Sequence, residues 1–259
     1  MIRKEKLLIV SHREIARDIF ELTFQGDLAA EIKRPGQFVH VKVSDAAVPL
    51  LRRPVSIARA DAAAGTITLI YRRGGEGTAL LAARKQGERV DVIGPLGNGF
   101  PADDSLKGRK VLLAGGGIGV PPLYGLSLKL KALGAEPVHV LGFDTKSSVF
   151  YEKEFEAIGE TFVSTVDGST GTKGFVTDII DLFRLNFDTL YACGPVQMLK
   201  ALEMRFPEKE VYLSLEERMG CGIGACFACV CHVPGDPDGY RKVCSDGPVF
   251  KAGEVVLSC

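Results

Sequence analysis

The sequence predicts a multidomain protein that consists of an antiparallel β-barrel, an α/β domain with a parallel sheet, and a small C-terminal domain rich in cysteine. Three observations predict this order. The first part of the chain contains short β-rich segments and little helix. The middle part alternates strands with helices, and six of the seven cysteines lie in the last quarter. We place the domains at residues 1–101, 102–213 and 214–259.

The composition excludes several classes of protein. The 32 Lys and Arg residues balance the 32 Asp and Glu residues, so the formal net charge is zero. A nucleic-acid-binding protein usually carries a basic excess, and we therefore expect no nucleic-acid partner. No apolar run reaches the length of a membrane span, and Leu7–Val10 is too short for the apolar region of a signal peptide. We expect a soluble cytoplasmic protein without a membrane partner, in which thiols stay reduced.

Four cysteines fit the ligand set of a [2Fe–2S] cluster. Their spacing is C-x4-C-x2-C-x14-C, and its first three members match the plant-type ferredoxin pattern. Gly222 and Gly224 allow the loop to curl around the inorganic sulfurs and to direct backbone N–H groups toward them. The predicted metal ligands are Cys221, Cys226, Cys229 and Cys244.

A structural zinc site is the alternative for the same cysteines. Such a site usually consists of two C-x2-C pairs, which this spacing does not provide. Cys231 and Cys259 remain outside the ligand set, and we interpret Cys231 as structural. Cys231-His232 lacks the second Cys/His pair that a Rieske centre needs.

Six β-rich segments separated by turn residues predict the barrel. Turns are expected at Gly26-Asp27, Pro35-Gly36 and Ala64-Gly65. The expected strands are Lys6–Val10, Ile19–Phe24, Gln37–Val43, Val55–Ala60, Thr66–Tyr71 and Arg89–Gly94.

Three segments of this region carry groups that suit a phosphate-bearing cofactor. Arg53-Pro54-Val55-Ser56 offers a guanidinium fork and a hydroxyl, and Ile70-Tyr71-Arg72 adds a second arginine. Gly74–Thr78 precedes an expected helix over Ala79–Lys85, and a glycine turn at a helix start favours anions. Thr78 is predicted to cap that helix. A second glycine loop follows at Gly94–Gly97.

Together these segments resemble the ferredoxin-reductase family of flavoproteins, in which the R-x-x-S strand binds FAD. The resemblance implies that Arg53 holds phosphate and that Ser56 lies beside the isoalloxazine. It also implies that Gly77 and Thr78 donate N–H groups to the pyrophosphate. The residues that the resemblance assigns to FAD are Arg53, Pro54, Val55, Ser56, Ile70, Tyr71, Arg72, Gly77 and Thr78.

The middle of the chain predicts a parallel sheet with a nucleotide-binding loop. A buried strand at Lys110–Ala114 is followed by a glycine loop and then by a helix over Pro122–Leu133. A nucleotide pyrophosphate binds at such a loop. The loop reads G-x-G-x-x-P, with Gly117 and Gly119 as its glycines, and this variant resembles the ferredoxin-reductase family. Further strands are expected at Val138–Phe143, Phe162–Val166 and Thr189–Ala192.

Two more features of this region concern the nicotinamide nucleotide. Cys193-Gly194-Pro195 resembles the C-G-P turn that lies near the nicotinamide in that family, although from the residues alone Cys193 reads as a small buried thiol. Asp144 follows the second strand, where a carboxylate accepts a hydrogen bond from the ribose 2′-hydroxyl. No arginine lies nearby for a 2′-phosphate. We therefore predict NAD(H) rather than NADP(H).

The C-terminal part sharpens the resemblance. After Val211–Leu215, which we expect to be the last strand, the chain reads S-L-E-E-R-M-x-C-G-I-G-A-C-x-x-C-V and later V-C-x-D-G-P-V-F. This pattern resembles the electron-transfer subunits of type B dihydroorotate dehydrogenases over essentially the whole chain. The resemblance implies a heterotetramer of two subunits of each kind with an FMN-containing catalytic subunit. It implies electron flow from FMN through the cluster and FAD to NAD⁺ in pyrimidine biosynthesis.

A flavin is needed between the other two cofactors, since nicotinamide exchanges electron pairs and the cluster exchanges single electrons. We identify no catalytic acid or base, because the four histidines, His12, His40, His139 and His232, are scattered. The same cysteine loop also occurs in diaphorase subunits of soluble hydrogenases and anaerobic sulfite reductases, and an NADH–ferredoxin oxidoreductase has the same chemistry. A zinc-stapled binding module without redox activity is the alternative from a different class.

Overall fold

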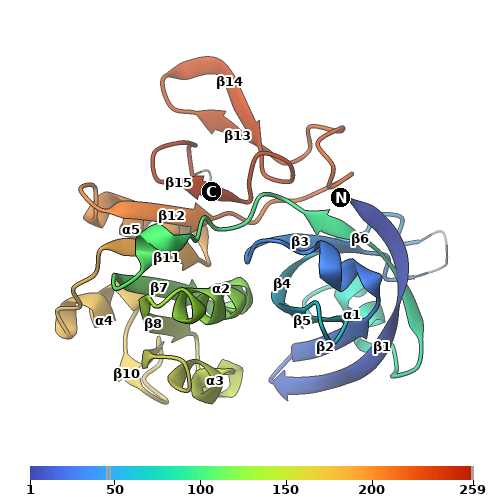
Figure 1. Ribbon diagram of the computed structural model, residues 1–259, viewed down its shortest axis with the longest axis horizontal. Coiled ribbons are helices and arrows are strands. Elements are labelled where there is room, and N and C mark those ends of the chain that lie inside the picture. The colour runs from blue at the N-terminus through green and yellow to red at the C-terminus, as the bar shows by residue number, and fades with distance from the viewer. Residues whose placement is uncertain (45, 47, 258–259) are drawn as a thin grey trace.

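The computed structural model contains a barrel, a sheet flanked by helices, and a smaller C-terminal extension (Figure 1). It describes residues 1–44, 46 and 48–257. Cys259 therefore lies outside the described residues. The extension sits over the junction of the other two parts, so all three meet in one region of the molecule (Figure 1). The predicted fold class is confirmed.

The N-terminal part is a closed six-stranded barrel in the order β1-β2-β5-β4-β3-β6, and every pairing is antiparallel. Alternating apolar residues of the strands fill its interior, including Leu22, Phe24, Ile67 and Leu69, all fully buried. The strands are β1 (Arg3–Ala16), β2 (Ile19–Gln25), β3 (Phe38–Val41), β4 (Arg53–Asp61), β5 (Thr66–Arg72) and β6 (Arg89–Leu96).

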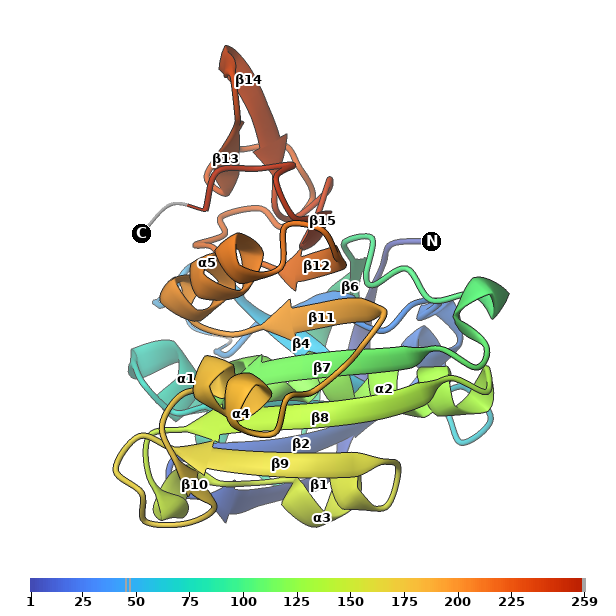
Figure 2. The ribbon, with the colours of Figure 1, turned by 90° about the vertical axis from the view of Figure 1, so that its left-hand side faces the viewer.

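The middle part is a seven-stranded sheet in the order β10-β9-β8-β7-β11-β12-β15 (Figure 2). All neighbours are parallel except the pair β12 and β15. The central strands are buried on both faces, as expected for a parallel sheet. The strands are β7 (Lys110–Gly116), β8 (Glu136–Phe143), β9 (Glu160–Thr165), β10 (Thr172–Lys173), β11 (Thr189–Cys193), β12 (Glu210–Ser214) and β15 (Val249–Lys251).

Helices cover both faces of this sheet. Helix α2 packs between the sheet and strand β4 of the barrel, whereas α4 and α5 lie on the opposite face (Figure 2). The helices are α1 (Glu76–Ala82), α2 (Val120–Ala132), α3 (Glu152–Glu156), α4 (Val176–Leu182) and α5 (Val196–Arg205). Short 3-10 turns are η1 (Asp27–Glu31), η2 (Asp104–Leu106), η3 (Gly117–Gly119) and η4 (Lys146–Ser148). Within the described residues, no helix combines the length and the apolar character that a membrane crossing requires.

The C-terminal extension shares its core with the other two parts. Strands β13 (Val230–Val233) and β14 (Asp236–Lys242) form an antiparallel hairpin, and most residues of β14 are exposed to solvent. Phe250, Val243 and Leu257 instead join one apolar cluster with Phe38 of the barrel and with residues of the sheet. The expectation that Val211–Leu215 is the last strand was wrong, because β13, β14 and β15 follow it.

The D-G-P-V-F segment fixes this extension in place. Asn98, just after β6, donates from its backbone N–H to the Gly247 carbonyl oxygen at 2.8 Å and from its side chain to the Asp246 carbonyl. Leu215 N–H donates to the Pro248 carbonyl oxygen at 2.9 Å. The next residues pair with β12 as strand β15. One short segment therefore ties the extension to both the barrel and the sheet.

Candidate functional site

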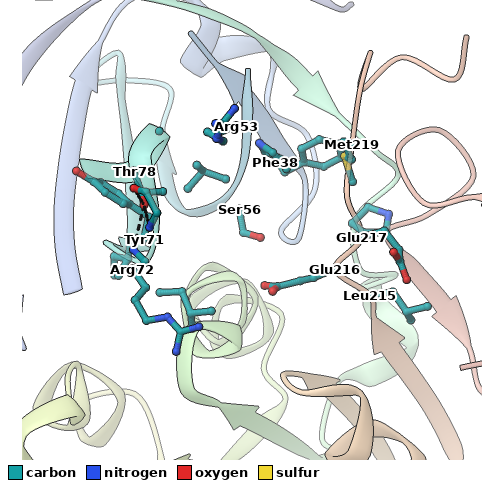
Figure 3. Close-up of a pocket in the computed structure, with 18 of the residues that line it drawn as sticks. Phe38, Arg53, Ser56, Tyr71, Arg72, Thr78, Leu215, Glu216, Glu217 and Met219 are labelled. Carbon is teal, nitrogen blue, oxygen red and sulfur yellow. Dashed lines mark hydrogen bonds between the residues drawn. The ribbon is translucent and has the colours of Figure 1, made fainter. Parts of the chain in front are cut away.

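The first candidate site is a cavity of about 430 Å³ between the barrel, the glycine loop of the sheet and the C-terminal extension (Figure 3). All nine residues that the sequence assigns to FAD line it. These residues are Arg53, Pro54, Val55, Ser56, Ile70, Tyr71, Arg72, Gly77 and Thr78. They come from three segments, namely strands β4 and β5 and the start of α1. The cavity therefore brings together a guanidinium pair, a hydroxyl and a helix start.

The start of α1 is shaped for close approach of the Arg53 guanidinium. A Cβ on Gly77 would lie 2.4 Å from Arg53 Nε, so only glycine allows this contact. The predicted helix over Ala79–Lys85 begins earlier, at Glu76, and Gly75 is its N-cap. The prediction that Thr78 is the cap was wrong. The Thr78 hydroxyl instead accepts hydrogen bonds from the N–H groups of Gly74 at 3.0 Å and Gly75 at 3.2 Å within the first turn.

Tyr71 is held in the wall of the cavity by its neighbours. Its hydroxyl lies 2.9 Å from His12 Nε2, and its ring stacks on Phe20 with centroids 5.8 Å apart. Burial raises the pKa of the Tyr71 hydroxyl, so this side chain stays neutral at physiological pH. A neutral, fixed aromatic ring provides an apolar surface against which a planar cofactor can pack.

The C-terminal extension supplies a wall of this cavity that sequence reasoning missed. Leu215, Glu216, Glu217 and Met219 line this wall, and Figure 3 shows the Glu216 side chain extending into the cavity and Met219 beside Phe38. Phe38 of β3 also lines the cavity, and it belongs to the same apolar cluster as Met219. The S-L-E-E-R-M segment contains the residues of the extension, but its sequence served only to recognise the family and did not place them at the cavity. They meet the barrel only because the extension folds back over it.

The second candidate site is a cavity of about 610 Å³ at the carboxyl ends of the parallel strands. Five of the six residues predicted to bind the nicotinamide nucleotide line it, namely Gly117, Gly119, Asp144, Gly194 and Pro195. In an open α/β sheet, ligands bind at this edge. The sixth, Cys193, is buried behind the cavity, and burial raises the pKa of its thiol above the usual range.

The glycine loop of this cavity needs its glycines for two reasons. Gly117 has φ +53, which side chains with a Cβ rarely adopt. A Cβ on Gly119 would lie 2.3 Å from the Cys193 carbonyl oxygen. The loop therefore packs directly on the Cys193-Gly194 turn, and this contact places two of the predicted segments in one cavity. Apolar residues that the sequence did not single out, Phe175 and Met198, complete the wall.

The two cavities are neighbours that share three residues. Arg72, Ile118 and Glu216 line both of them. Glu216 is an exposed residue, yet protein lies close enough around its carboxyl that desolvation raises its pKa. The nearby charge of Arg72 partly opposes this rise. Ligands in the two cavities would therefore meet at this shared wall.

The four predicted cluster ligands lie together in the C-terminal extension as two adjacent pairs. The N–H group of Cys221 donates to Cys226 Sγ at 3.3 Å, and the Gly224 N–H donates to Cys244 Sγ at 3.2 Å. Cys229 is buried beside Cys244 and raises its pKa. Lys242 braces the loop, because its Nζ donates to the Gly224 carbonyl at 2.8 Å.

Backbone N–H groups of the loop point at the sulfur of Cys221. Ile223 donates at 3.4 Å and Ala225 at 3.2 Å. Burial opposes ionisation of Cys221, but these donors and the Cys226 thiol outweigh it and lower its pKa to about 7. Burial and the Cys229 thiol instead raise the pKa of Cys244 to about 12. The loop is therefore built to stabilise negative charge on sulfur at one of its edges.

The cysteines lie in two neighbouring pairs, and this arrangement is the one expected for a cluster with two metal ions. A [2Fe–2S] cluster takes two thiolates on each of its irons, and the pairs Cys221–Cys226 and Cys229–Cys244 match that requirement.

Comparison with known proteins agrees with this geometry. Two curated proteins named "Dihydroorotate dehydrogenase B (NAD(+)), electron transfer subunit", from Bacillus mycoides (strain KBAB4) and Bacillus cereus (strain AH187), are each 58% identical to the chain. Each alignment covers 99% of this chain and 100% of the relative. The chain belongs to this family. Residues 216–256 also match the family model described as the iron-sulfur cluster binding domain of dihydroorotate dehydrogenase B.

Solved structures extend the comparison of this dihydroorotate dehydrogenase B family member to other reductases. A structure titled as an NADH-dependent reduced ferredoxin-NADP oxidoreductase superposes with a TM-score of 0.85 at 33% identity. It covers 98% of this chain and 90% of that one. The ferredoxin reductase of carbazole 1,9a-dioxygenase, at 23% identity and a TM-score of 0.69, covers 81% of this chain and 67% of that one, and shows the shared fold.

Proposed function

We propose that this chain passes electrons from the FMN of a dihydroorotate dehydrogenase catalytic subunit, through a [2Fe–2S] cluster and FAD, to NAD⁺. Membership in the family of dihydroorotate dehydrogenase B electron transfer subunits supports this function. The observation that carries it is the shared wall of the two cavities, formed by Arg72, Ile118 and Glu216. A flavin in one cavity and a nicotinamide in the other would meet there.

The FAD cavity holds its cofactor through complementary groups. Arg53 and the N–H groups of Gly77 and Thr78 would bind the pyrophosphate, because the guanidinium and the helix start both favour anions. The buried ring of Tyr71 and the hydroxyl of Ser56 would orient the isoalloxazine. FAD supplies the ability to accept an electron pair and release single electrons. The protein contributes binding, orientation and exclusion of water.

The larger cavity would bind NAD(H). The loop over Gly117 and Gly119 offers backbone N–H groups at the start of α2 to the pyrophosphate. Asp144 lies at the end of β8 where its carboxylate would accept from a ribose hydroxyl. Gly194 and Pro195 would contact the nicotinamide end. Cys193 would contribute indirectly, because Gly119 of the nucleotide loop packs against its backbone carbonyl.

The cluster loop would serve as the entry point for single electrons. We propose Cys221 and Cys226 as ligands of one iron and Cys229 and Cys244 as ligands of the other. The cluster supplies one-electron exchange. Met219 lines the FAD cavity only two residues before Cys221, so the chain itself joins the cavity to the loop.

We propose that a catalytic partner acts on the organic substrate, because the relatives of this chain are named as electron transfer subunits. We propose the FMN-containing subunit in a heterotetramer of two plus two, and we expect the complex in the cytoplasm. The exposed edge of the cluster loop, where Ile223 is 53% and Phe227 is 50% exposed, is the proposed contact with that partner. Exchange of single electrons requires this loop to lie close to the partner.

Absorption and co-purification test the proposed function. Protein purified anaerobically should show flavin and iron–sulfur bands together, and NADH should bleach both. Zinc-containing, colourless protein would refute the proposal. Co-purification with an FMN protein that forms orotate should identify the partner. Association only with a hydrogenase or sulfite reductase subunit, or NADH-driven reduction of ferredoxin without such a partner, would instead support the diaphorase alternative.

A further inference from the structure

His40 is a buried imidazole without an ordinary hydrogen bond. It lies on β3, and its residue is 1% exposed. Neither Nδ1 nor Nε2 has a hydrogen-bond partner among the described residues. Burial of an unsatisfied polar ring is costly, whereas an apolar side chain of similar size would fill the same space without that cost. An unpaired group of this kind in a folded protein calls for a functional explanation.

The ring lies directly against the cluster loop. A Cβ on Gly222 would lie 2.7 Å from His40 Nδ1 and 3.1 Å from its Cε1. Gly222 has φ +73, so the loop turns sharply at the point of contact. The ring also lies near the Cys221 backbone carbonyl, but the two groups are not in hydrogen-bond geometry. His40 therefore touches the turn that begins at the first cluster ligand.

Strand β3 connects this contact to the FAD cavity. Side chains alternate along a strand, so Phe38 and His40 project on the same side. Val39 and Val41 face the barrel interior, because both belong to its core cluster. Phe38 instead joins the cluster that contains Cys229 and Cys244, and it also lines the FAD cavity (Figure 3). Strand β3 thus places Phe38 at the proposed FAD site and His40 at the cysteine loop.

The contact controls the hydrogen bonds that reach sulfur. The peptide between Cys221 and Gly222 precedes the N–H groups of Ile223 and Ala225, which donate to Cys221 Sγ at 3.4 Å and 3.2 Å. Such donors stabilise the additional negative charge of a reduced cluster and raise its reduction potential. A group that fixes this peptide therefore acts on the potential through these N–H groups.

The imidazole of His40 carries at least one N–H donor in either of its protonation states. We propose that His40 is a positioning residue that donates this N–H to the Cys221 carbonyl when the loop binds its cluster. It thereby fixes the Cys221–Gly222 turn and sets the potential of the cluster. This inference rests on the proposed function, since it requires the [2Fe–2S] cluster.

The test compares His40→Asn with His40→Leu in the purified complex with its catalytic subunit. Asparagine keeps an N–H donor near the position of Nδ1, whereas leucine has similar volume and no donor. Redox titration of the cluster, followed by EPR spectroscopy, is the main measurement. FAD content and the rate of flavin reduction by NADH are measured on the same samples. His139→Asn is the matched control, because His139 is also fully buried but contacts Ser127 and Thr161 in the sheet domain.

We expect His40→Leu to lower the equilibrium constant for cluster reduction about tenfold, which corresponds to 59 mV for a one-electron couple. His40→Asn should recover most of this loss, and His139→Asn should leave the cluster potential unchanged. If leucine leads to cluster loss, retention of the cluster by the asparagine variant supports the proposal equally.

Three outcomes would overturn the donor role. They are a wild-type potential and EPR spectrum in His40→Leu, equal shifts in the leucine and asparagine variants, and equal loss of the cluster in both. A wild-type protein that binds no [2Fe–2S] cluster would instead refute the proposed function, and the EPR spectrum of the unmodified complex distinguishes the two failures.

Discussion

Single residues of the cysteine loop differ sharply in their surroundings. Cys244 accepts an N–H from Gly224 and lies beside Cys229, whereas Cys231 points from β13 into the apolar cluster that the extension shares with the sheet. Burial raises the pKa of Cys231 to about 11, which keeps it a neutral thiol. Two buried cysteines 13 residues apart (244 − 231) thus differ, because one lies beside another proposed cluster ligand and the other lies among apolar side chains.

The first prediction compares these two thiols. We expect Cys244→Ser to lose most of the iron–sulfur absorption, because serine cannot replace a thiolate ligand at equal affinity. Cys231→Ser should keep the absorption while lowering thermal stability by a few degrees, owing to a hydroxyl buried among apolar groups. Iron and sulfide analysis with a melting curve checks both. Full cluster content in Cys244→Ser would mean that another residue is the fourth ligand.

His139 is a buried histidine whose role is in folding. Its Nδ1 lies 2.9 Å from Thr161 Oγ1 and its Nε2 lies 2.7 Å from Ser127 Oγ. Thr161 donates its own proton to the Gly159 carbonyl, so the imidazole carries its proton on Nδ1 and accepts at Nε2. Burial lowers the pKa of His139 to about 4, from 6.5 in an exposed histidine.

The second prediction follows from this pKa. Between pH 6.5 and 4 the unfolded chain binds a proton at His139 that the native protein does not bind, so stability falls as the pH falls. The contribution is fully present above pH 6.5, and its loss reaches at most about 1.4 kcal/mol per pH unit. Urea titrations should show that the gap in unfolding free energy between wild type and His139→Gln narrows from pH 7 to pH 5. Parallel pH profiles would contradict this assignment.

Residues were predictable where their motif is contiguous. Arg53–Ser56 and Gly74–Thr78 each lie within one turn or strand, so local sequence reveals their chemistry. Glu216 and Phe38 were missed because they enter the cavity through packing between segments far apart in the chain. The contact of His40 with the cysteine loop could not be predicted from its sequence neighbourhood, because it depends on the Gly222 turn that folds against the ring.

Helices and strands, too, were predictable where their own sequence determines them and were missed where they depend on contacts with distant segments. Long strands with clear alternation, such as β2 and β5, were predicted to within a residue or two. Strand β15 was missed because three residues carry no periodic pattern, and it exists through pairing with β12. The start of α1 was placed too late, because Thr78 bonds backward to Gly74 and Gly75 from inside the helix.

The third prediction concerns the C-terminal extension without its cluster. The loop is held mainly by N–H groups that point at sulfur, and the hairpin β13–β14 is largely exposed. Strand β15 is instead paired with β12 and buried at Val249 and Phe250. Removal of the cluster by chelation should therefore accelerate hydrogen exchange in residues 220–242 and leave β15 protected.

Mass spectrometry of the cluster-free and cluster-containing chains checks this difference. Strand β7 in the centre of the sheet provides an internal control, because it lies far from the extension in the strand order. Unchanged exchange across residues 220–242 would show that the loop is ordered without metal. Loss of protection in β15 as well would show that the metal organises the whole extension.

At the scale of the molecule, the function depends on how three parts are placed around two adjoining cavities. Strand β4 carries Arg53 and Ser56, which line the cavity proposed for FAD, and the same strand packs against α2, which follows the glycine loop. The extension closes the flavin cavity with Glu216 and Met219 and then continues into the cysteines. The order of the cofactor sites in space therefore follows from contacts between parts, which no single motif encodes.

The fourth prediction tests that placement at the contact between α2 and β4. A Cβ on Gly125 would lie 2.8 Å from the Ala58 carbonyl oxygen, so Gly125→Val must push the helix away from the barrel. The substitution leaves the residues proposed to bind FAD and the cluster unchanged, but it should move the nucleotide loop relative to the proposed FAD cavity. We expect the rate of flavin reduction by NADH to fall by a factor of about ten or more, because hydride transfer is sensitive to displacements of about 1 Å. Stopped-flow absorption at saturating NADH measures this rate, with FAD and iron content determined on the same sample.

Lys131→Ala, at an exposed position of the same helix, is the matched control and should react at the wild-type rate. A wild-type rate in a fully loaded Gly125→Val protein would show that the alignment of the two cavities does not depend on this contact.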